Sequence, residues 1–380
     1  MNVLLTVASS SVTGPAERLF GNARCLTAAG HEARVAFDTV RPGNLAERAR
    51  AEGVALEEGL ALSRKPTPRQ IVHDLGRLRA LLRERRADIV HSHFSHDHHL
   101  ALISSAGLRG PLRIVRAAET EANLTPTVAR RLAYRRTDGL EVATRGRARA
   151  LVEGLGVDPL RVGVLPGAVD PVHFSPTVHG RPSELRRRLG IAADVLLVGI
   201  VARLKPERRH AELVEAVASL RGGFPRLRLA IVGRGEGEQA LRVQVERLGL
   251  QREVLFAGYW AGDDLVEAYR GLDIAVWLAD GNDGSARGLL EAMACGLPVV
   301  AGAAGAASEI VREERTGCLV PPGDVPGLAR ALARLAGSAA DRRAFGEAAR
   351  QRVMARFTWA QRGPALLEFY RHVQELPAAA

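Results

Sequence analysis

Short runs of β-branched and aliphatic residues alternate with longer helical patterns along almost the whole chain. In the first part, strands are predicted at 3–7, 33–37, 88–91 and 112–116, with helices over 15–29 and 70–85 between the first three. This alternation is the sequence form of repeated βαβ units, in which helices cover both faces of a parallel sheet. The predicted fold class is α/β.

The alternation is interrupted once, after a predicted strand over 161–165. The run PGAVDP at 166–171 and a turn-rich stretch through Pro176, Gly180 and Pro182 indicate a linker there. A second doubly wound series follows, with strands predicted at 195–201, 228–232, 254–256, 274–278 and 298–301. Because 380 residues exceed the usual size of one core, we predict domains over 1–175 and 176–355, and a helix over 356–380 that crosses back to the first domain.

Composition indicates the cellular compartment of such a chain. No apolar stretch approaches the ~20 residues that span a bilayer, and the first apolar run has no basic region before it, so neither a membrane helix nor a secretion signal is expected. Cys25, Cys295 and Cys318 are too scattered for a disulfide framework, which suits a reducing compartment. We therefore expect a cytoplasmic protein. The net charge of +11 favours anionic partners, although an arginine-rich genome composition gives the same value.

The segment from Asp280 to Val300 carries the most chemical information. It runs from a strand end through a glycine-rich loop into a helix and then a new strand. Free N–H groups and the positive dipole end at a helix start bind anions, and Gly284 and Gly288 would let a phosphate approach the backbone closely. Asp283 and Glu291 lie eight positions apart, so each can accept hydrogen bonds from different hydroxyls of one extended ligand. Two carboxylates beside a phosphate indicate a ligand that contains a sugar.

This segment resembles the donor-site signature of the family 4 retaining glycosyltransferases of the GT-B fold. In that signature two acids separated by seven residues precede an EAMAxGxPV run, and Asp283 and Glu291 stand at the two acidic positions. The resemblance implies that Glu291 holds the donor ribose. It also implies that Asp283, with a shorter arm than the usual Glu, contacts the transferred sugar near its anomeric carbon.

Further matches extend over nearly the whole chain. The run TGPAE at 13–17 resembles the family's glycine loop, GHE at 30–32 its strand lead-in and HSH at 91–93 its HxH strand end. The stretch from Gly156 to Pro176 is similar to the family's segment before the hinge. The resemblance therefore implies two Rossmann-like domains that face a cleft, with the acceptor on the first domain and the donor on the second.

Cations for the donor diphosphate are expected in the run ARLKPER at 202–208, which resembles the family's GRLxPEK. Arg203 matches directly, Arg208 replaces the Lys, and Lys205 is a nearby additional cation. Such groups stabilise a leaving nucleoside diphosphate as its charge develops, a role that a metal fills in other glycosyltransferases. The alternative for a basic loop of this kind is plain solvation.

Two further loops complete the expected donor site. The GRGEG run at 233–237 lacks dinucleotide-fingerprint spacing and is interpreted as a donor-side loop. The FAGYW run at 256–260 resembles the family's segment near the nucleotide base, with interdomain packing of Tyr259 and Trp260 as the alternative. The predicted donor-binding residues are Gly14, Arg203, Lys205, Arg208, Gly233, Gly258, Tyr259, Asp283, Gly284, Ser285, Ala286, Arg287, Gly288, Leu289 and Glu291.

Five histidines and Asp97 between positions 91 and 99 form a candidate metal cluster. Their place after a predicted strand instead favours His93 or His96 facing a ligand, with a solvated loop or helix start for the others, and we predict no metal. Many relatives carry a His beside the donor sugar where this chain has Glu119, which either binds a sugar hydroxyl or marks a changed donor or lost activity. The candidate catalytic residues are Asp283, Arg203, Arg208, Glu119 and His93.

Arginine clusters make the first domain strongly basic. They comprise Arg77, Arg79, Arg83, Arg85, Arg86, Arg130, Arg131, Arg135 and Arg136. Solvated helix faces are the more frequent explanation of such clusters, and docking at the inner face of an anionic membrane is the second hypothesis, because many acceptors in the family are lipid-linked.

The prediction is a metal-independent, retaining glycosyltransferase that needs no cofactor. It moves a sugar from a nucleoside-diphosphate sugar to a hydroxyl of a carbohydrate or lipid-linked acceptor, in cell-envelope polysaccharide, lipopolysaccharide or glycolipid synthesis. The resemblance implies same-face attack, in which the departing phosphate helps to deprotonate the acceptor, so no protein nucleophile is nominated. Open alternatives are a sugar phosphorylase, a nucleotide-sugar epimerase and a degenerate sugar- or nucleotide-binding protein. Nucleic acid is not an expected partner, because no binding motif occurs and aromatics make up only 4%.

Overall fold

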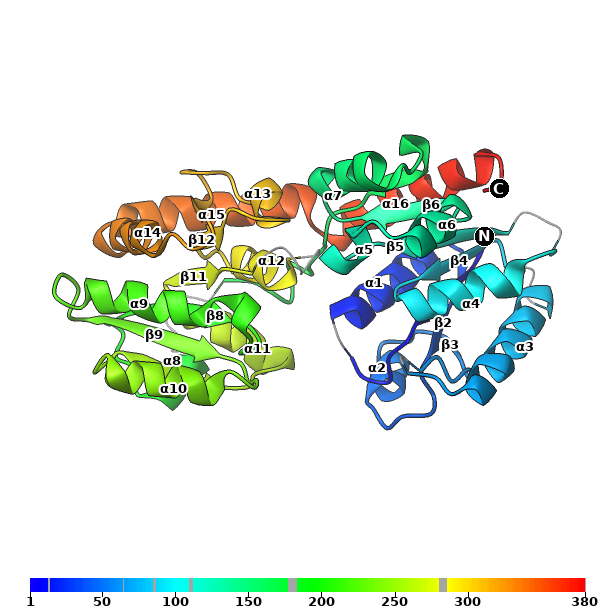
Figure 1. Ribbon diagram of the computed structural model, residues 1–380. Coiled ribbons are helices and arrows are strands. Elements are labelled where there is room, and N and C mark those ends of the chain that lie inside the picture. Colours follow the sequence, from blue (N-terminus) through cyan, green and yellow to red (C-terminus); the bar gives the residue numbers. More distant parts are fainter. Residues whose placement is uncertain are drawn as a thin grey trace. The chain divides into compact units, whose positions relative to one another are not determined.

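The computed structural model describes residues 1–12, 14–63, 65–84, 87–108, 112–176, 183–279 and 286–379, which form two compact units (Figure 1). The first unit combines Met1–Gly167 with Trp359–Ala380, and the second is Ala168–Thr358. These divisions lie a few residues from the predicted boundaries after 175 and 355. The reason lies in unit 2, where the Val169 N–H donates to the Phe357 carbonyl over 2.9 Å and the Phe174 ring lies edge-on to Tyr269, 6.0 Å between centroids.

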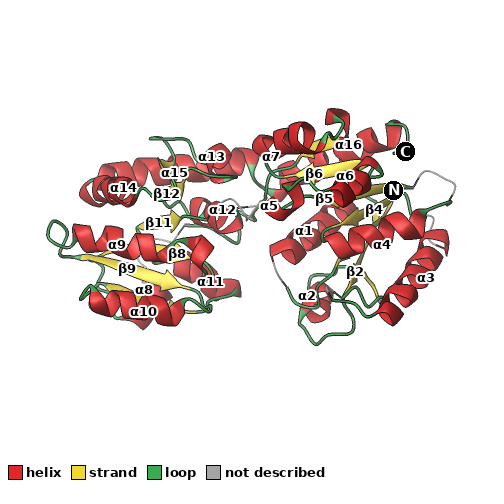
Figure 2. Ribbon diagram, in the orientation of Figure 1, coloured by secondary structure: helices red, strands yellow, loops and turns green. Residues whose placement is uncertain are grey.

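Unit 1 is built on a seven-stranded parallel sheet in the order β3-β2-β1-β4-β5-β6-β7. Its strands are β1 (Asn2–Val7), β2 (Glu32–Phe37), β3 (Leu56–Glu57), β4 (Ile89–Ser92), β5 (Arg113–Ala117), β6 (Gly139–Val142) and β7 (Val162–Val164). Its helices include α1 (Gly14–Ala28), α2 (Leu45–Ala51), α3 (Pro68–Glu84), α4 (Ser95–Ser105), α5 (Glu121–Leu124), α6 (Val128–Arg135), α7 (Arg145–Arg149) and α16 (Trp359–Glu375). Neighbouring β1 residues belong to different cores, since Leu5 packs with α1 and α16 whereas Leu4 packs with α3 and α4. Helices therefore cover both faces of the sheet, as the strand–helix alternation predicts (Figure 2).

Unit 2 contains a six-stranded parallel sheet in the order β10-β9-β8-β11-β12-β13. Its strands are β8 (Leu196–Val201), β9 (Leu227–Val232), β10 (Val254–Gly258), β11 (Ile274–Trp277), β12 (Val299–Gly302) and β13 (Gly317–Val320). Its helices include α8 (Glu184–Leu189), α9 (His210–Leu220), α10 (Glu238–Arg247), α11 (Gly262–Arg270), α12 (Arg287–Ala294), α13 (Ala307–Ile310), α14 (Val325–Gly337) and α15 (Ala339–Arg356).

The strand order reverses once in each sheet, between β1 and β4 in unit 1 and between β8 and β11 in unit 2. Open α/β sheets bind ligands beside the carboxyl ends of the strands at such a reversal. The loops that follow β1, β4, β8 and β11 are therefore where the chemistry of each unit should lie. In the described part of the chain, no helix has the length and apolar composition that crossing a bilayer requires.

Candidate active site

Three loops at the carboxyl edge of the unit 2 sheet are joined by backbone hydrogen bonds. The Gly233 N–H donates to the Gly258 carbonyl over 2.8 Å, and the Ala202 N–H donates to the Val232 carbonyl over 3.0 Å. Gly233 has a φ of +147°, and a Cβ there would lie 1.9 Å from the Ala202 carbonyl oxygen, so only glycine fits. The predicted donor-side loops thus form one connected surface around Arg203.

The three predicted cations differ in the exposure and the contacts of their side chains. Arg203 is exposed, and its guanidinium makes no hydrogen bond or ion pair with another residue that the structure describes. Lys205 Nζ lies 3.6 Å from a carboxylate oxygen of Glu236, and Arg208 is half-buried at the end of a short 3-10 turn, Pro206–Arg208. Of the three, Arg203 has the side chain most available to an incoming anion.

Helix α12 begins on the other side of the strand reversal, directly after the loop that follows β11. Its N-cap is Ala286, buried and in the left-handed conformation with φ +45°, which an alanine adopts only under backbone strain. The predicted Asp283, Gly284 and Ser285 lie outside the described residues. Leu289 is fully buried against the sheet, so its role is to fix the helix rather than to offer a side chain to a ligand.

Glu291 is buried in this helix, with only 3% of its surface exposed. Arg287 Nε donates to one carboxylate oxygen over 2.5 Å, and the Tyr269 hydroxyl lies 3.0 Å from the other. Burial, followed by the adjacent carboxylate, raises the pKa of Tyr269 well above its usual value, so the phenol stays protonated and can donate. These two contacts fix the orientation of the Glu291 carboxylate, a group that can accept about four hydrogen bonds.

Replacing Tyr269 with phenylalanine tests this arrangement. The change removes the hydroxyl that lies 3.0 Å from Glu291 Oε2 and 3.2 Å from the Gly288 carbonyl oxygen, and losing a hydrogen bond to a buried charged group costs about 1–3 kcal/mol. We expect the free energy of unfolding to fall by that amount, measured by urea denaturation, together with weaker nucleotide binding. Tyr259→Phe is the matched control for the free energy of unfolding alone, because that ring is 62% exposed and lies under the Arg234 guanidinium at 4.5 Å. Equal effects of the two changes would contradict the assignment.

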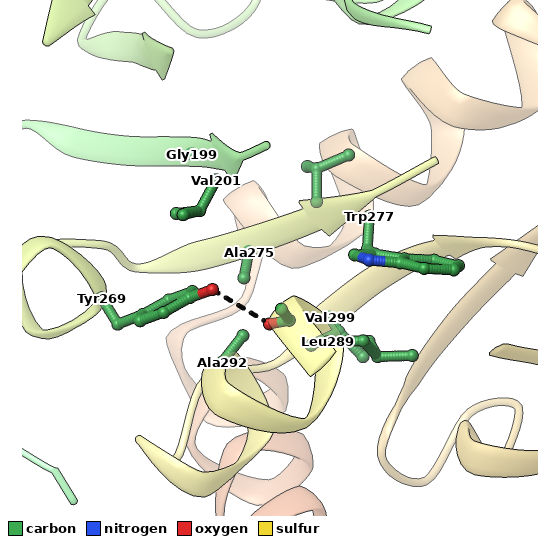
Figure 3. Close-up of a pocket in the computed structure, with 10 residues that line it drawn as sticks. Gly199, Val201, Tyr269, Ala275, Trp277, Leu289, Ala292 and Val299 are labelled. Carbon is green, nitrogen blue, oxygen red and sulfur yellow. Dashed lines mark hydrogen bonds between the residues drawn. The ribbon is translucent and has the colours of Figure 1, made fainter. Parts of the chain in front are cut away.

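Gly288 lacks a side chain for a reason that the sequence did not show. A Cβ there would lie 3.3 Å from the Tyr269 hydroxyl and 3.5 Å from the Val201 carbonyl oxygen, so the glycine lets α12 pack closely on β8 and α11. Figure 3 shows the small pocket between these elements, lined by Val201, Tyr269, Trp277 and Leu289 among others. Its cavity of about 10 Å³ has room for roughly one water molecule, so this pocket is a packing feature beneath the helix start.

At the matching strand reversal in unit 1, Gly14 is the first residue of α1, the helix after β1, and His93 directly follows β4. A Cβ on Gly14 would meet nothing within 4 Å, which leaves the start of α1 open. The His93 ring is 3% exposed, with Nδ1 3.3 Å from the Thr6 carbonyl oxygen. Burial, followed by the neighbouring His91, lowers the pKa of His93 well below its usual value, so the ring is neutral at neutral pH.

Asp97 explains how the loop before α4 is held. Its carboxylate accepts hydrogen bonds from the His93 and Phe94 N–H groups over 3.0 and 2.8 Å and from the Thr6 hydroxyl over 3.0 Å. Burial raises the pKa of Asp97 to about 6, although these hydrogen bonds and Arg116 oppose the shift. Asp97 therefore acts as a structural cap. In the described parts of the chain, no three His, Cys, Asp or Glu side chains are placed to hold a metal ion.

Glu119 lies in a buried ion pair at the end of β5. Arg18 NH1 of α1 is 2.9 Å from a Glu119 carboxylate oxygen and 3.5 Å from Glu141 of β6. Burial raises the pKa of Glu119, while Arg18 lowers it. Arg18 and Glu141 had no motif to mark them, because their partners lie about a hundred or more positions away in the sequence.

Two of the remaining histidines are buried rather than solvated, so that expectation was wrong for them. His91 Nδ1 lies 2.8 Å from the Tyr370 hydroxyl, and His98 Nε2 lies 2.9 Å from the Thr137 hydroxyl. Both rings are buried in unit 1, and each has a hydroxyl group as its polar partner. Trp260 is also a core residue of its own unit, with its indole N–H donating to the Ala257 carbonyl over 2.8 Å.

The two doubly wound units define a two-domain α/β protein, and unit 2 carries cations and a helix start where its strand order reverses. Residues 183–352 match the family described as glycosyl transferases group 1, and residues 12–173 match glycosyltransferase family 4. The chain is 34% identical over 300 residues to the D-inositol 3-phosphate glycosyltransferase of Stackebrandtia nassauensis, covering 77% of this chain and 65% of that protein. It is 31% identical over 325 residues to the protein of the same name from Kineococcus radiotolerans, covering 78% of this chain and 74% of that protein. The chain belongs to the family 4 glycosyltransferases.

Solved structures agree on the fold. HepE of Anabaena in complex with UDP is 21% identical, covers 97% of this chain and 99% of its own, and superposes with a TM-score of 0.83. A glycosyltransferase from Rickettsia africae is 19% identical, covers 99% of both chains and gives a TM-score of 0.85. The predicted GT-B fold of two Rossmann-like domains is confirmed.

Proposed function

We propose that this protein is a retaining, metal-independent glycosyltransferase that uses a nucleoside-diphosphate sugar and needs no cofactor. One observation carries the proposal. The exposed Arg203, the start of α12 and the oriented carboxylate of Glu291 belong to elements that follow or adjoin the strand reversal of unit 2. That arrangement combines cations and free N–H groups for a diphosphate with a fixed acceptor for sugar or ribose hydroxyls.

The proposed chemistry follows from where charge develops. As the bond between the anomeric carbon and the diphosphate breaks, negative charge grows on the departing phosphate, and Arg203 and Arg208 stabilise it. The acceptor hydroxyl attacks from the same face and gives its proton to that phosphate, so the configuration at the anomeric carbon is retained. Asp283, Glu119 and His93 are proposed to line the sugar and acceptor sides of the reaction.

The substrates are proposed from the relatives. HepE was solved in complex with UDP, so UDP is the first nucleotide to test as the donor's leaving group. Two relatives are named for D-inositol 3-phosphate, so a polyol phosphate is the first acceptor to test. A lipid-linked acceptor at the inner face of the membrane, in cell-envelope polysaccharide or glycolipid synthesis, is the second, and it places the enzyme in the cytoplasm.

A thermal-shift series with UDP, GDP, TDP, CMP and ADP tests the donor site. A ligand at ~100 times its dissociation constant stabilises the folded state by about 2.7 kcal/mol, which is readily measured. We expect a shift with one diphosphate that EDTA does not change and that Glu291→Ala and Arg203→Ala remove. No shift with any nucleotide would overturn the donor-site assignment, and a product with inverted configuration by NMR would overturn retention.

A further inference from the structure

Three loops at the carboxyl edge of the unit 1 sheet, which follow β1, β2 and β3, are joined into one surface. Their described residues are 8–12, 38–44, 58–63 and 65–67. The Asp38 N–H donates to the Ser9 carbonyl over 3.2 Å, which ties the second loop to the first. The Thr39 hydroxyl donates to the Leu60 carbonyl over 2.6 Å, which ties it to the third. Carboxyl edges of parallel sheets bind ligands, so this joined surface is a candidate binding site.

Arg41, in the second loop, has its guanidinium held on two sides. Its Nε lies 3.0 Å from a carboxylate oxygen of Asp38, and its NH2 donates to the Ser63 hydroxyl in the third loop over 2.9 Å. Its NH1 makes no hydrogen bond with a residue that the structure describes, and 47% of the side chain is exposed. A guanidinium has five N–H donors, so those of NH1 are available to the oxygens of a ligand.

The groups that hold Arg41 are themselves buried. Asp38 is 1% exposed, and its other oxygen accepts the backbone N–H of Arg41 over 3.2 Å. Ser63 is 6% exposed and follows Leu62, a buried residue with a strained φ of +38° whose N–H donates to the fully buried Asp74 over 2.9 Å. Surface ion pairs usually join two mobile side chains. Here both partners are immobile, so the guanidinium is held in one orientation.

The charge of this surface is positive. Two acids occur in the described residues of the three loops, of which Asp38 is buried and Glu58 is ion-paired to Arg50 of α2 over 2.5 Å. Lys65 is exposed and lies two positions after the serine that Arg41 contacts. An oriented guanidinium with a second cation and a hydroxyl nearby matches a phosphate monoester, which carries close to two negative charges at pH 7 and accepts paired hydrogen bonds.

We propose that Arg41, Ser63 and Lys65 bind a phosphate group of the acceptor on unit 1. The inference rests on the proposed function and deepens it, because it assigns the phosphate of a polyol phosphate acceptor to particular side chains. The diphosphate of the donor has the same chemistry, so the test separates these two sources of phosphate.

Isothermal titration calorimetry of the whole protein tests the proposal, in the presence of the nucleotide that gives a thermal shift. The probes are D-inositol 3-phosphate, inositol without phosphate and inorganic phosphate. We expect D-inositol 3-phosphate to bind at least about tenfold more tightly than inositol, and inorganic phosphate to compete with it. Arg41→Met should weaken binding of D-inositol 3-phosphate about tenfold or more. Arg41→Lys should recover part of the affinity, because it keeps the charge but loses the planar fork.

Arg48→Met is the matched control, because Arg48 is 51% exposed and its Nε lies 2.6 Å from Glu52 on the adjacent helix turn. It should bind D-inositol 3-phosphate like the unchanged protein. Both variants should keep the nucleotide thermal shift, which shows that they are folded.

Three results would overturn the proposal. One is equal affinity of Arg41→Met and Arg48→Met for D-inositol 3-phosphate. Another is a protein that shifts with a nucleotide but binds neither phosphate probe, which leaves the proposed function intact. The third is loss of the nucleotide shift in folded Arg41→Met but not in Arg48→Met, which would assign Arg41 to the diphosphate of the donor.

Discussion

Replacing Arg362 with methionine is expected to lower the free energy of unfolding by about 3–5 kcal/mol, the cost of breaking a buried ion pair from one side. Arg362 of α16 is buried, and its NH2 lies 2.6 Å from a carboxylate oxygen of the fully buried Glu141. Its Nε donates to Asn22 over 3.0 Å, and NH1 donates to the carbonyls of Leu165 and Pro166 over 2.8 and 2.6 Å. The variant therefore leaves a buried carboxylate with weaker partners and several acceptors unsatisfied.

Urea denaturation measures the effect, with Arg371→Met on the exposed side of the same helix as the matched control, expected within about 0.5 kcal/mol of the unchanged protein. A second variant isolates the charge. Combining Arg362→Met with Glu141→Gln removes the unpaired buried carboxylate and should recover about 0.5–3 kcal/mol. Should Arg362→Met cost no more than Arg371→Met, the pair would not stabilise the unit.

The same pair sets an acid limit on stability. Burial alone would raise the pKa of Glu141, but Arg362, His91 and Arg18 together lower it to about 2. An unfolded glutamate titrates near about 4.3. Between these values the unfolded chain binds more protons, so the stabilisation is complete above about pH 4.3 and is lost as the pH falls towards about 2. In Glu141→Gln, the loss of stability over this acid range should be smaller, measured by urea midpoints at successive pH values.

The fold could be predicted because most strands are apolar runs that are buried on both faces. The strands at 195–201 and 228–232 were predicted from such runs, and β8 and β9 lie there. Three strands were not predicted. β3 has only two residues, β6 interrupts its apolar run with Glu141, and β13 begins with Gly317 and Cys318. In a sequence, a charged residue such as Glu141 indicates a loop, and its burial in a strand can be expected only when its distant partner is known.

The candidate site shows the same limit. Glu291 and Arg203 were predicted because the short runs that contain them resemble the donor-site motifs of the family. Tyr269 was not predicted, although it orients Glu291, because it lies 22 positions away on another helix. Long-range packing also explains why position 288 is a glycine. A Cβ there would lie 3.3 Å from the Tyr269 hydroxyl and 3.5 Å from the Val201 carbonyl oxygen, a contact that a phosphate-loop interpretation does not include.

Arg203→Ala is expected to lower kcat by about 10²–10³-fold, the usual effect of removing one preorganised group that stabilises developing charge. Arg203 is exposed on the loop that follows β8, so its loss should leave the free energy of unfolding within about 0.5 kcal/mol of the unchanged protein. Arg203→Lys should retain part of the rate, because it keeps the charge but loses the planar fork that binds two phosphate oxygens.

Steady-state transfer from the donor identified by thermal shift measures this prediction, with kcat and KM determined separately, because a group that acts mainly in the transition state lowers kcat and kcat/KM together. Arg226→Ala is the matched control, an exposed arginine of the same unit that is ion-paired to Asp194 before β8. It should leave kcat unchanged. A kcat for Arg203→Ala within about twofold of the control would show that Arg203 does not stabilise the departing diphosphate and would leave the cation role to Arg208 of the same loop.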